Sequence, residues 1–186
     1  MQATTGTPLS EDVGSSPRSR TRRHLAVWAA TALSTYLLDQ ATKELAQRRL
    51  TVGVPRRLPG GWLSLDLTHN AGAAFSVGTG YTVALTLVAL AVIGVCLRVA
   101  HRLASTGWAI ALGLLLGGAA GNVTDRLLRP PGPLRGSVVD FIHLTHWPVF
   151  NLADAAICVA AAIFVLLSVR GVRLDGSRSG TDGGDG

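Results

Sequence analysis

The sequence VFNLADAAICVAAAIFVLLSV, Val149 to Val169, is an apolar run interrupted near its start by an amide and a carboxylate. About 20 residues at a rise of about 1.5 Å each cross the hydrocarbon core of a bilayer, so this run predicts a membrane-spanning helix. A carboxylate inside such a segment costs several kcal/mol even on lenient insertion scales. Asn151 and Asp154 are therefore candidates for a functional site.

Three further apolar runs have a comparable length and predict three more helices. They are Leu25 to Leu38, Tyr81 to Leu97 and Gly107 to Val123. The first of them reaches spanning length only if Asp39 is tolerated near its end. We predict an all-α membrane protein with four transmembrane helices. A soluble helical bundle is the alternative.

The formal net charge of +6 raises the question of nucleic-acid binding, because clustered Lys and Arg are its electrostatic signature. In this chain the arginines instead flank the apolar runs, which is typical of cytoplasmic anchors. We therefore expect a multi-pass protein with both termini in the cytoplasm and no nucleic-acid partner. The loop after the first run departs from this distribution. It carries, on the predicted outer side, Lys43, Arg48, Arg49, Arg56 and Arg57.

The two ends of the chain differ in composition from its centre. Residues 1–23 and 171–186 are polar and rich in small residues, so we predict two disordered cytoplasmic tails. Residues 24–170 then form one transmembrane domain. Within it the alternating stretch GWLSLDLT, Gly61 to Thr68, predicts a short strand with one apolar face. We expect a small extracytoplasmic β-element at about residues 44–80.

Several groups of polar residues interrupt the apolar sequence, and a four-helix arrangement brings them all to the same side of the membrane. Convergence at one depth favours a site over scattered structural residues. The groups are DQATK at Asp39 to Lys43, HNAGAAF at His69 to Phe75, GGAAGNVTDR at Gly117 to Arg126, VVDF at Val138 to Phe141, and FNLAD at Phe150 to Asp154.

The spacing within these groups suits helices. Asp39 and Lys43 are four residues apart and can neutralise one another on one helix face. Asn122 precedes Asp125 by three residues, as Asn151 precedes Asp154, which predicts that each amide lies beside its carboxylate. Glycines recur every four residues and predict a surface for close helix packing. They are Gly113, Gly117 and Gly121.

Asp140 and Asp154 differ from the other acids because their sequence neighbours are apolar and include no cation. Two carboxylates close together in a poorly solvated place can share a proton and act as acid and base on one water. That is aspartic peptidase chemistry, for which we expect no metal and no cofactor. Two alternatives stay open. One is a buried polar cluster that only fixes helix register, and the other is an ion or proton relay, which predicts acids spread across the membrane thickness.

Other catalytic chemistry has less support in the sequence. No serine stands in a Gly-x-Ser-x-Gly elbow, and His69 and His143 are expected to be solvated loop residues. Cys96 and Cys158 each lie alone in an apolar run, so they predict small buried hydrophobes rather than a disulfide or a zinc site.

Taken together, the motifs DQATK, Thr68 to Phe75 (T-x-N-x-G-A-A-F), GNVTDR, VVDF and FNLAD resemble the lipoprotein signal peptidase family, signal peptidase II, in the family's order over about residues 24–170. The resemblance implies a bacterial inner-membrane aspartic endopeptidase with four transmembrane helices and a small β-cradle. Its substrates would be prolipoproteins that carry diacylglycerol on the lipobox cysteine, cut just before that cysteine. Globomycin-like inhibitors would occupy the same groove.

The resemblance also implies roles for individual residues. The catalytic aspartates of the family fall on Asp140 and Asp154. We expect a monomer that contacts membrane lipids and has its active site near the outer leaflet. The residues that support the catalytic pair or bind substrate would be Asp39, Lys43, Asn70, Gly72, Asn122, Asp125, Arg126 and Asn151.

Overall fold

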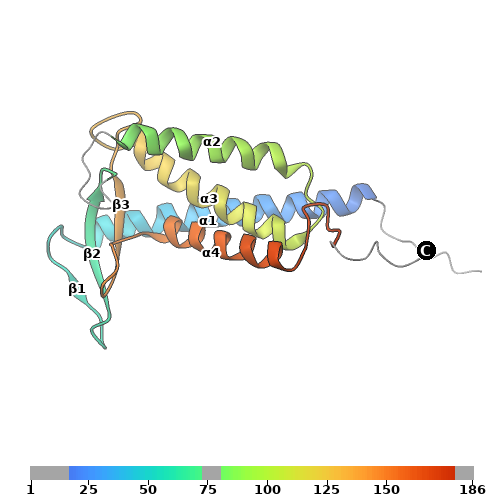
Figure 1. Ribbon diagram of the computed structural model, residues 1–186. Coiled ribbons are helices and arrows are strands. Elements are labelled where there is room, and N and C mark those ends of the chain that lie inside the picture. The colour runs from blue at the N-terminus through green and yellow to red at the C-terminus, as the bar shows by residue number, and fades with distance from the viewer. Residues whose placement is uncertain (1–16, 73–80, 179–186) are drawn as a thin grey trace, which may run out of the picture.

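The apolar runs become long helices in the computed structural model, which describes residues 17–72 and 81–178. The parts of the predicted tails at residues 1–16 and 179–186, and the HNAGAAF motif beyond Gly72, lie outside the described residues. Helices dominate, and strands interrupt them (Figure 1). The elements are α1 (Pro17–Arg49), β1 (Arg56–Arg57), β2 (Leu63–Asn70), α2 (Thr82–Ala100), α3 (Thr106–Leu128), β3 (Val138–Leu144) and α4 (Leu152–Val169).

Three helices of the described chain are long and apolar enough to cross a membrane, namely α2, α3 and α4. These three correspond to predicted spans, which are thereby confirmed as helices of spanning length. Helix α1 does not meet the same criterion although it has 33 residues, because arginines crowd its start and Asp39, Gln40 and Lys43 interrupt its second half. Its place as a fourth span stays a prediction.

Helix α1 also extends beyond the predicted run, Leu25 to Leu38, in both directions. At its N-terminal end, residues 17–23 are helical, although they were predicted to belong to a disordered tail. At its C-terminal end, residues 44–49 are helical, so the β-element begins later than expected, with β1 at Arg56.

The C-terminal segment that follows α4 is likewise ordered over residues 171–178. The indole nitrogen of Trp108 donates to the carbonyl oxygen of Val172 at 2.9 Å, and the backbone nitrogen of Ala104 donates to Leu174 at 3.0 Å. A bridge between Val172 and Arg178 closes the turn. Composition predicted that this segment would be disordered. The hydrogen bonds offset the conformational entropy that the segment loses on ordering.

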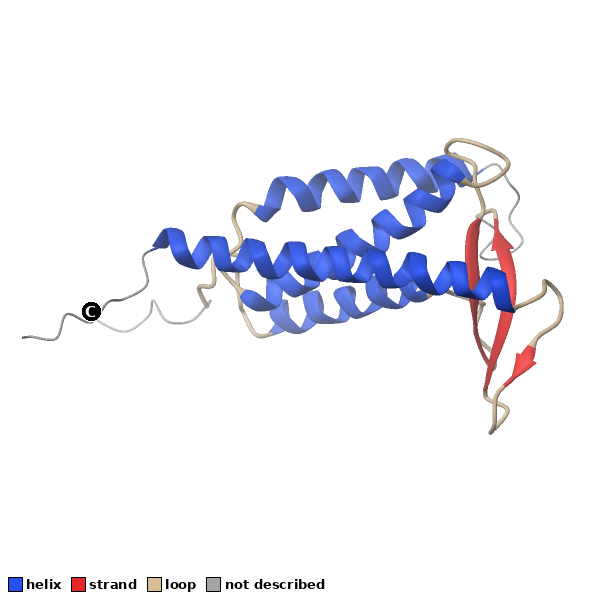
Figure 2. Cartoon of the chain, turned by 180° about the vertical axis from the view of Figure 1, so that it is seen from behind, coloured by secondary structure: helices blue, strands red, loops and turns tan. Residues whose placement is uncertain are grey.

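The strands form one antiparallel sheet in the order β1-β2-β3. Strand β2 pairs with β3 from Leu63↔Leu144 to Asn70↔Val138, with an irregularity in register between Leu65 and Thr68. The sheet lies across one end of the helix bundle (Figures 1 and 2), at the C-terminal ends of α1 and α3 and the N-terminal end of α4. The sheet therefore covers the end of the bundle toward which the polar groups of the sequence converge.

The glycine stripe of α3 packs directly against α1, as predicted. A Cβ atom at Gly117 would lie 2.5 Å from the carbonyl oxygen of Ala32, and one at Gly121 would clash with the carboxylate of Asp39. Small residues let two helix backbones approach closely, and here they also leave room for a buried carboxylate.

Gly117→Ala is expected to lower the free energy of unfolding by about 1–3 kcal/mol, because the new methyl group meets a backbone carbonyl that cannot rotate away. Thermal unfolding in detergent measures the effect. Gly94→Ala is the matched control, since a Cβ at Gly94 in α2 meets nothing within 4 Å. We expect the control to be neutral or slightly stabilising through its higher helix propensity. Equal melting temperatures for the two variants would contradict close α1–α3 packing.

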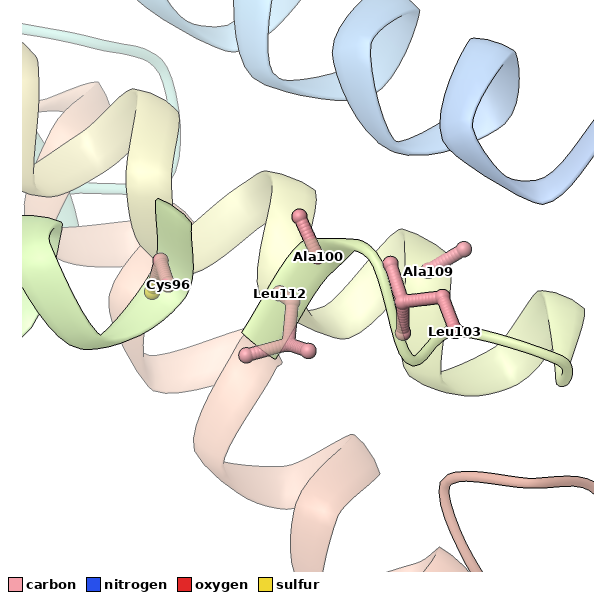
Figure 3. Close-up of a cluster of buried hydrophobic side chains, with 5 residues drawn as sticks. All are labelled: Cys96, Ala100, Leu103, Ala109 and Leu112. Carbon is pink, nitrogen blue, oxygen red and sulfur yellow. The ribbon is translucent and has the colours of Figure 1, made fainter. Parts of the chain in front are cut away.

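An apolar cluster stabilises the other end of the bundle, around the turn between α2 and α3 (Figure 3). Cys96 is 1% exposed and lies in this cluster, which confirms its expected role as a small buried hydrophobe. The same expectation for Cys158 was wrong, because this side chain is exposed on the surface of α4. An apolar run does not distinguish positions that face partner helices from positions that face outward. The cluster consists of Cys96, Ala100, Leu103, Ala109 and Leu112.

Candidate active site

The side chains singled out from the sequence gather at the sheet end of the bundle. All ten lie in the described part of the chain, and hydrogen bonds or ion pairs join nine of them into one network, while Arg126 interacts electrostatically with its carboxylates. They come from α1 (Asp39, Lys43), the end of β2 (Asn70, Gly72), α3 (Asn122, Asp125, Arg126), β3 (Asp140) and the start of α4 (Asn151, Asp154).

Asp140 is held in β3 with 1% of its side chain exposed. Its two oxygens accept hydrogen bonds from different elements, one from Asn70 Nδ2 at 2.9 Å and one from Asn151 Nδ2 at 2.6 Å. Burial raises the pKa of Asp140 from its ordinary 3.8 to about 6. The nearby Asp154 carboxylate also raises it, while the hydrogen bonds from Asn70 and Asn151 act in the opposite direction. Asp140 is thus suited to hold a proton.

Asp154 lies in the first turn of α4, where Asn151 is the N-cap residue. The two form a capping box: Asp154 N donates to Asn151 Oδ1 at 3.0 Å, and Asn151 N donates to Asp154 Oδ2 at 3.2 Å. A reciprocal cap satisfies two backbone donors that the first turn of a helix otherwise leaves unpaired. The three-residue spacing read from FNLAD is therefore a helix-cap geometry. Asp154 is half-buried, so it stays accessible to a substrate.

Two amides connect the carboxylates of Asp140 and Asp154. Asn151 Nδ2 donates to Asp140 and also to Asn122 Oδ1 at 3.1 Å, while Asn122 Nδ2 donates to Asp154 Oδ1 at 2.8 Å. Each amide uses both its oxygen and its nitrogen, so the orientation of each is determined by its partners. Asn122 thus contacts Asp154 rather than Asp125, the carboxylate predicted from sequence spacing.

Lys43 occupies the centre of a second group, in which its own side chain and those of Asp39 and Asp125 are buried. Its Nζ lies 2.8 Å from Asp39 Oδ2 and 2.9 Å from Asp125 Oδ2, and donates to Asn122 Oδ1 at 2.9 Å. The predicted pairing of Asp39 with Lys43 is confirmed. Asp39 also accepts from the backbone nitrogen of Ala153 at 3.0 Å, which ties α1 to the start of α4. Lys43 therefore connects the structural carboxylates to the amide that holds Asp154.

Sequence reasoning missed two residues of this group. Arg129 Nε lies 2.5 Å from Asp125 Oδ1, so Asp125 is paired with Lys43 and Arg129 rather than with the adjacent Arg126. The four-residue spacing from Asp125 to Arg129 on a helix was a usable signal. Gln40 Nε2 donates to Asp39 Oδ2 at 3.1 Å and to the carbonyl oxygen of Gly121 at 3.2 Å. The only sequence signal for Gln40 was its position within the DQATK motif.

Arg126 is 9% exposed and lies near the aspartate pair. The carboxylates of Asp140, Asp154 and Asp125 all interact electrostatically with its guanidinium group. Its buried Nη1 has no hydrogen-bond partner among the described residues. An unsatisfied donor of this kind beside two carboxylates is available for a ligand oxygen.

Gly72 determines how Asn70 is presented. Its φ of +101° lies in the region that side-chain-bearing residues rarely adopt, and its backbone nitrogen donates to Asn70 Oδ1 at 2.9 Å. That bond leaves Asn70 Nδ2 directed to Asp140. The two histidines expected to be solvated loop residues lie in strands instead: His69 is exposed in β2, and His143 is half-buried in β3, 3.4 Å from Ser64.

The stability of the protein is expected to fall as the pH rises from about 4 to about 7. The folded state holds a proton on Asp140 more tightly than the unfolded state, so ionisation of Asp140 penalises folding, by about 3 kcal/mol for a pKa of about 6 against 3.8. Asp140→Asn should flatten this dependence of the melting temperature on pH. Asp66→Asn, in β2 outside the polar network, should leave it unchanged. An identical pH slope in wild type and Asp140→Asn would contradict a raised pKa.

The fold and the polar network define the class of protein. The chain is a mostly helical membrane protein with a small sheet across one end, where buried Asp140 of β3 and half-buried Asp154 of α4 belong to one polar network. Two solved bacterial membrane enzymes share the fold with a TM-score of 0.68. One is 23% identical, covering 77% of this chain and 88% of that chain, and the other is 22% identical, covering 78% and 94%.

The profile of the signal peptidase (SPase) II family matches residues 31–170. A lipoprotein signal peptidase of Streptomyces coelicolor is 49% identical over 160 residues, which are 86% of this chain and 78% of the relative. One of Mycobacterium avium is 44% identical over 166 residues, covering 89% and 91%. The chain belongs to the signal peptidase II family, and the resemblance carried by its motifs is confirmed.

Proposed function

We propose that this protein is an aspartic endopeptidase that removes signal peptides from prolipoproteins bearing a diacylglyceryl group, cutting just before the lipidated cysteine. The observation that carries the proposal is the linkage of Asp140 to Asp154 through Asn151 and Asn122, at the sheet end of the bundle. Membership of the signal peptidase II family, with relatives named lipoprotein signal peptidases, supports the substrate class.

In the proposed mechanism the two aspartates divide the proton transfers between them. Asp140, whose pKa burial raises to about 6, would act as the acid, and half-buried Asp154 would act as the base. Asp154 takes a proton from the attacking water while the water oxygen bonds to the scissile carbonyl carbon. At the same time Asp140 gives its proton to the carbonyl oxygen. When the C–N bond breaks, the proton on Asp154 passes to the leaving amine and Asp140 recovers its proton from the hydroxyl.

The charges of the network are consistent with one proton on the catalytic pair. Four carboxylates, Asp39, Asp125, Asp140 and Asp154, face three cations, Lys43, Arg126 and Arg129. A single shared proton makes the group neutral. Neutrality matters because an uncompensated charge in a poorly solvated site is costly.

The remaining residues of the network would position the substrate and the catalytic pair. Arg126 has a buried nitrogen free to bind a backbone carbonyl of the substrate. Asn70, Asn122 and Asn151 hold the aspartate oxygens, and Gly72 orients Asn70. Asp39, Lys43 and Asp125 join α1, α3 and α4 behind them.

We further propose that α1 is the fourth transmembrane helix of a domain spanning residues 24–170. Asp39 and Lys43 are fully buried against the bundle, while Leu37 and Leu38 are more than half exposed. The polar residues that lower the hydropathy of α1 thus face partner helices and would not meet lipid. Arginines at the bundle end opposite the sheet favour cytoplasmic termini. The site would then lie near the outer leaflet of the bacterial inner membrane, and we propose that the protein acts as a monomer.

Incubation of the purified protein with a diacylglyceryl-modified precursor tests the function. We expect a shortened product that begins at the lipidated cysteine, and we expect globomycin to prevent its formation. The matched control is the same precursor without the lipid, which should be cleaved far more slowly. Cleavage of neither precursor would overturn the proposal, and equal cleavage of both would overturn the role of the lipid.

A further inference from the structure

The cationic residues at the C-terminal end of α1 and in β1 are only partly explained by the catalytic network. Lys43 is buried in that network, and Arg48 pairs with Glu44 at 2.7 Å. Arg49 and Arg56 are exposed and form no ion pair with any carboxylate in residues 17–72 and 81–178. Unpaired arginines on the predicted outer side of a membrane protein run against the usual charge distribution, so they call for a partner.

The two arginines border a pocket of about 370 Å³ between the C-terminal end of α1 and the sheet. The other lining residues are largely apolar: Leu45 from α1, Leu50 directly after it, Leu65 from β2 and Phe141 from β3. The pocket therefore combines an apolar interior with two guanidinium groups, which suits a ligand that has an apolar body and an anionic head.

This pocket lies on the opposite face of β3 from the catalytic pair. Successive side chains of a strand point to opposite faces, so Phe141 points away from its neighbour Asp140. Phe141 and Val139 pack with Ala46 of α1, whereas Asp140 bonds to Asn70 and Asn151. A ligand in the pocket would not contact the reacting groups.

An apolar path leads to the pocket along α1. Leu38, Thr42, Leu45 and Arg49 are spaced by four, three and four residues, so they share one helix face. Leu38 and Leu45 are 57% and 55% exposed. In a membrane this stripe would lie against acyl chains and end at Arg49.

We propose that the pocket binds an anionic phospholipid of the surrounding leaflet, with its phosphate on Arg49 and Arg56 and an acyl chain along the α1 stripe. Guanidinium groups bind phosphate through paired, charge-assisted hydrogen bonds, which makes them the natural partners for such a head group. The neutral diacylglyceryl group of the proposed substrate carries no charge and would leave both arginines unpaired. The site is therefore distinct from the substrate site and independent of the proposed cleavage.

Native mass spectrometry of the purified protein in neutral detergent tests the proposal by counting bound lipids. The probes are dioctanoyl phosphatidylglycerol, dioctanoyl phosphatidylcholine, dioctanoylglycerol and inorganic phosphate. Two double variants remove the same charge: Arg49→Gln with Arg56→Gln at the pocket, and Arg48→Gln with Arg57→Gln beside it. All four arginines are exposed, so neither variant is expected to unfold the protein.

We expect phosphatidylglycerol to bind the wild type about tenfold more tightly than phosphatidylcholine, because the choline cation of phosphatidylcholine offsets its phosphate charge and is repelled by the two guanidinium groups. The pocket variant should lose this preference, while the control variant should change the affinity by less than about twofold. Equal losses in both variants, equal binding of the two phospholipids, or equally tight binding of inorganic phosphate would overturn the proposal. Displacement of phosphatidylglycerol by dioctanoylglycerol at equal affinity would also overturn it and would assign the pocket to the lipid of the substrate.

Discussion

Replacing either Asp140 or Asp154 by asparagine is expected to lower the turnover of a lipidated precursor by at least about 10³-fold. In the proposed mechanism one proton moves between the water, the substrate and both carboxylates, and an amide can neither accept nor return it. Asparagine keeps the shape of the side chain but offers one acceptor oxygen where the carboxylate has two, so each variant keeps one of the two hydrogen bonds that the aspartate accepts and loses the other. Both variants should remain folded in the membrane.

The measurement is the single-turnover rate of precursor cleavage, combined with the melting temperature of each variant in detergent. Asp66→Asn is the control, because Asp66 lies in β2 outside the polar network. We expect its rate to equal that of the wild type. If either catalytic variant kept substantial turnover while folded, the assignment of that aspartate would be withdrawn.

Replacing Lys43 by methionine is expected to destabilise the protein by about 3–5 kcal/mol. The Lys43 side chain is fully buried between Asp39 and Asp125, so its removal leaves two buried carboxylates with less compensation. Activity should fall as well, since Lys43 also holds the oxygen of Asn122, the amide that contacts Asp154. Thermal and denaturant unfolding in detergent measure the change.

Arg48→Gln provides the comparison for Lys43→Met. The Arg48–Glu44 pair has the same i, i+4 spacing on the same helix, but both of its side chains are more than half exposed. Exposed pairs contribute up to about 1 kcal/mol, so the control should be nearly neutral. Asp39→Asn combined with Lys43→Met should recover part of the stability, because it removes one of the unpaired charges. Equal small losses for Lys43→Met and Arg48→Gln would show that the buried network is not stabilising.

Much of the architecture can be predicted from the order of residues along the chain. Apolar runs of spanning length predict α2, α3 and α4. A chain in lipid must satisfy its own backbone hydrogen bonds, and a helix does so within one segment. The glycine spacing of α3 predicts close packing, and the four-residue spacing of Asp39 and Lys43 predicts their ion pair. These are local features, decided by which residues fall on one helix face.

The same order of residues also singled out the polar cluster as a whole. Carboxylates and amides in apolar surroundings are costly, so their positions in the sequence are informative before any contact is known. A relay would have acids spread along the bundle, but the carboxylates of the described helices, Asp39, Glu44, Asp125 and Asp154, belong to the halves of α1, α3 and α4 nearest the sheet.

Partner choice within the cluster was decided only by the tertiary structure. The sequence offered Asn122 a carboxylate three residues away, yet its amide bonds to Asp154 in another helix. Arg126 is adjacent to Asp125, yet Lys43 and Arg129 hold that carboxylate. The pairing of β2 with β3, which brings Asn70 to Asp140, joins segments about seventy residues apart.

The physical reason lies in the range of the interactions concerned. Helical periodicity, turns and the cost of placing a charge in lipid depend on neighbours within a few residues. They can therefore be predicted from the sequence. Hydrogen bonds and ion pairs between elements depend on separations of about 3 Å, which arise only after helices pack and the sheet closes over their ends. Local order therefore fixes which residues are available, and packing selects which of them meet.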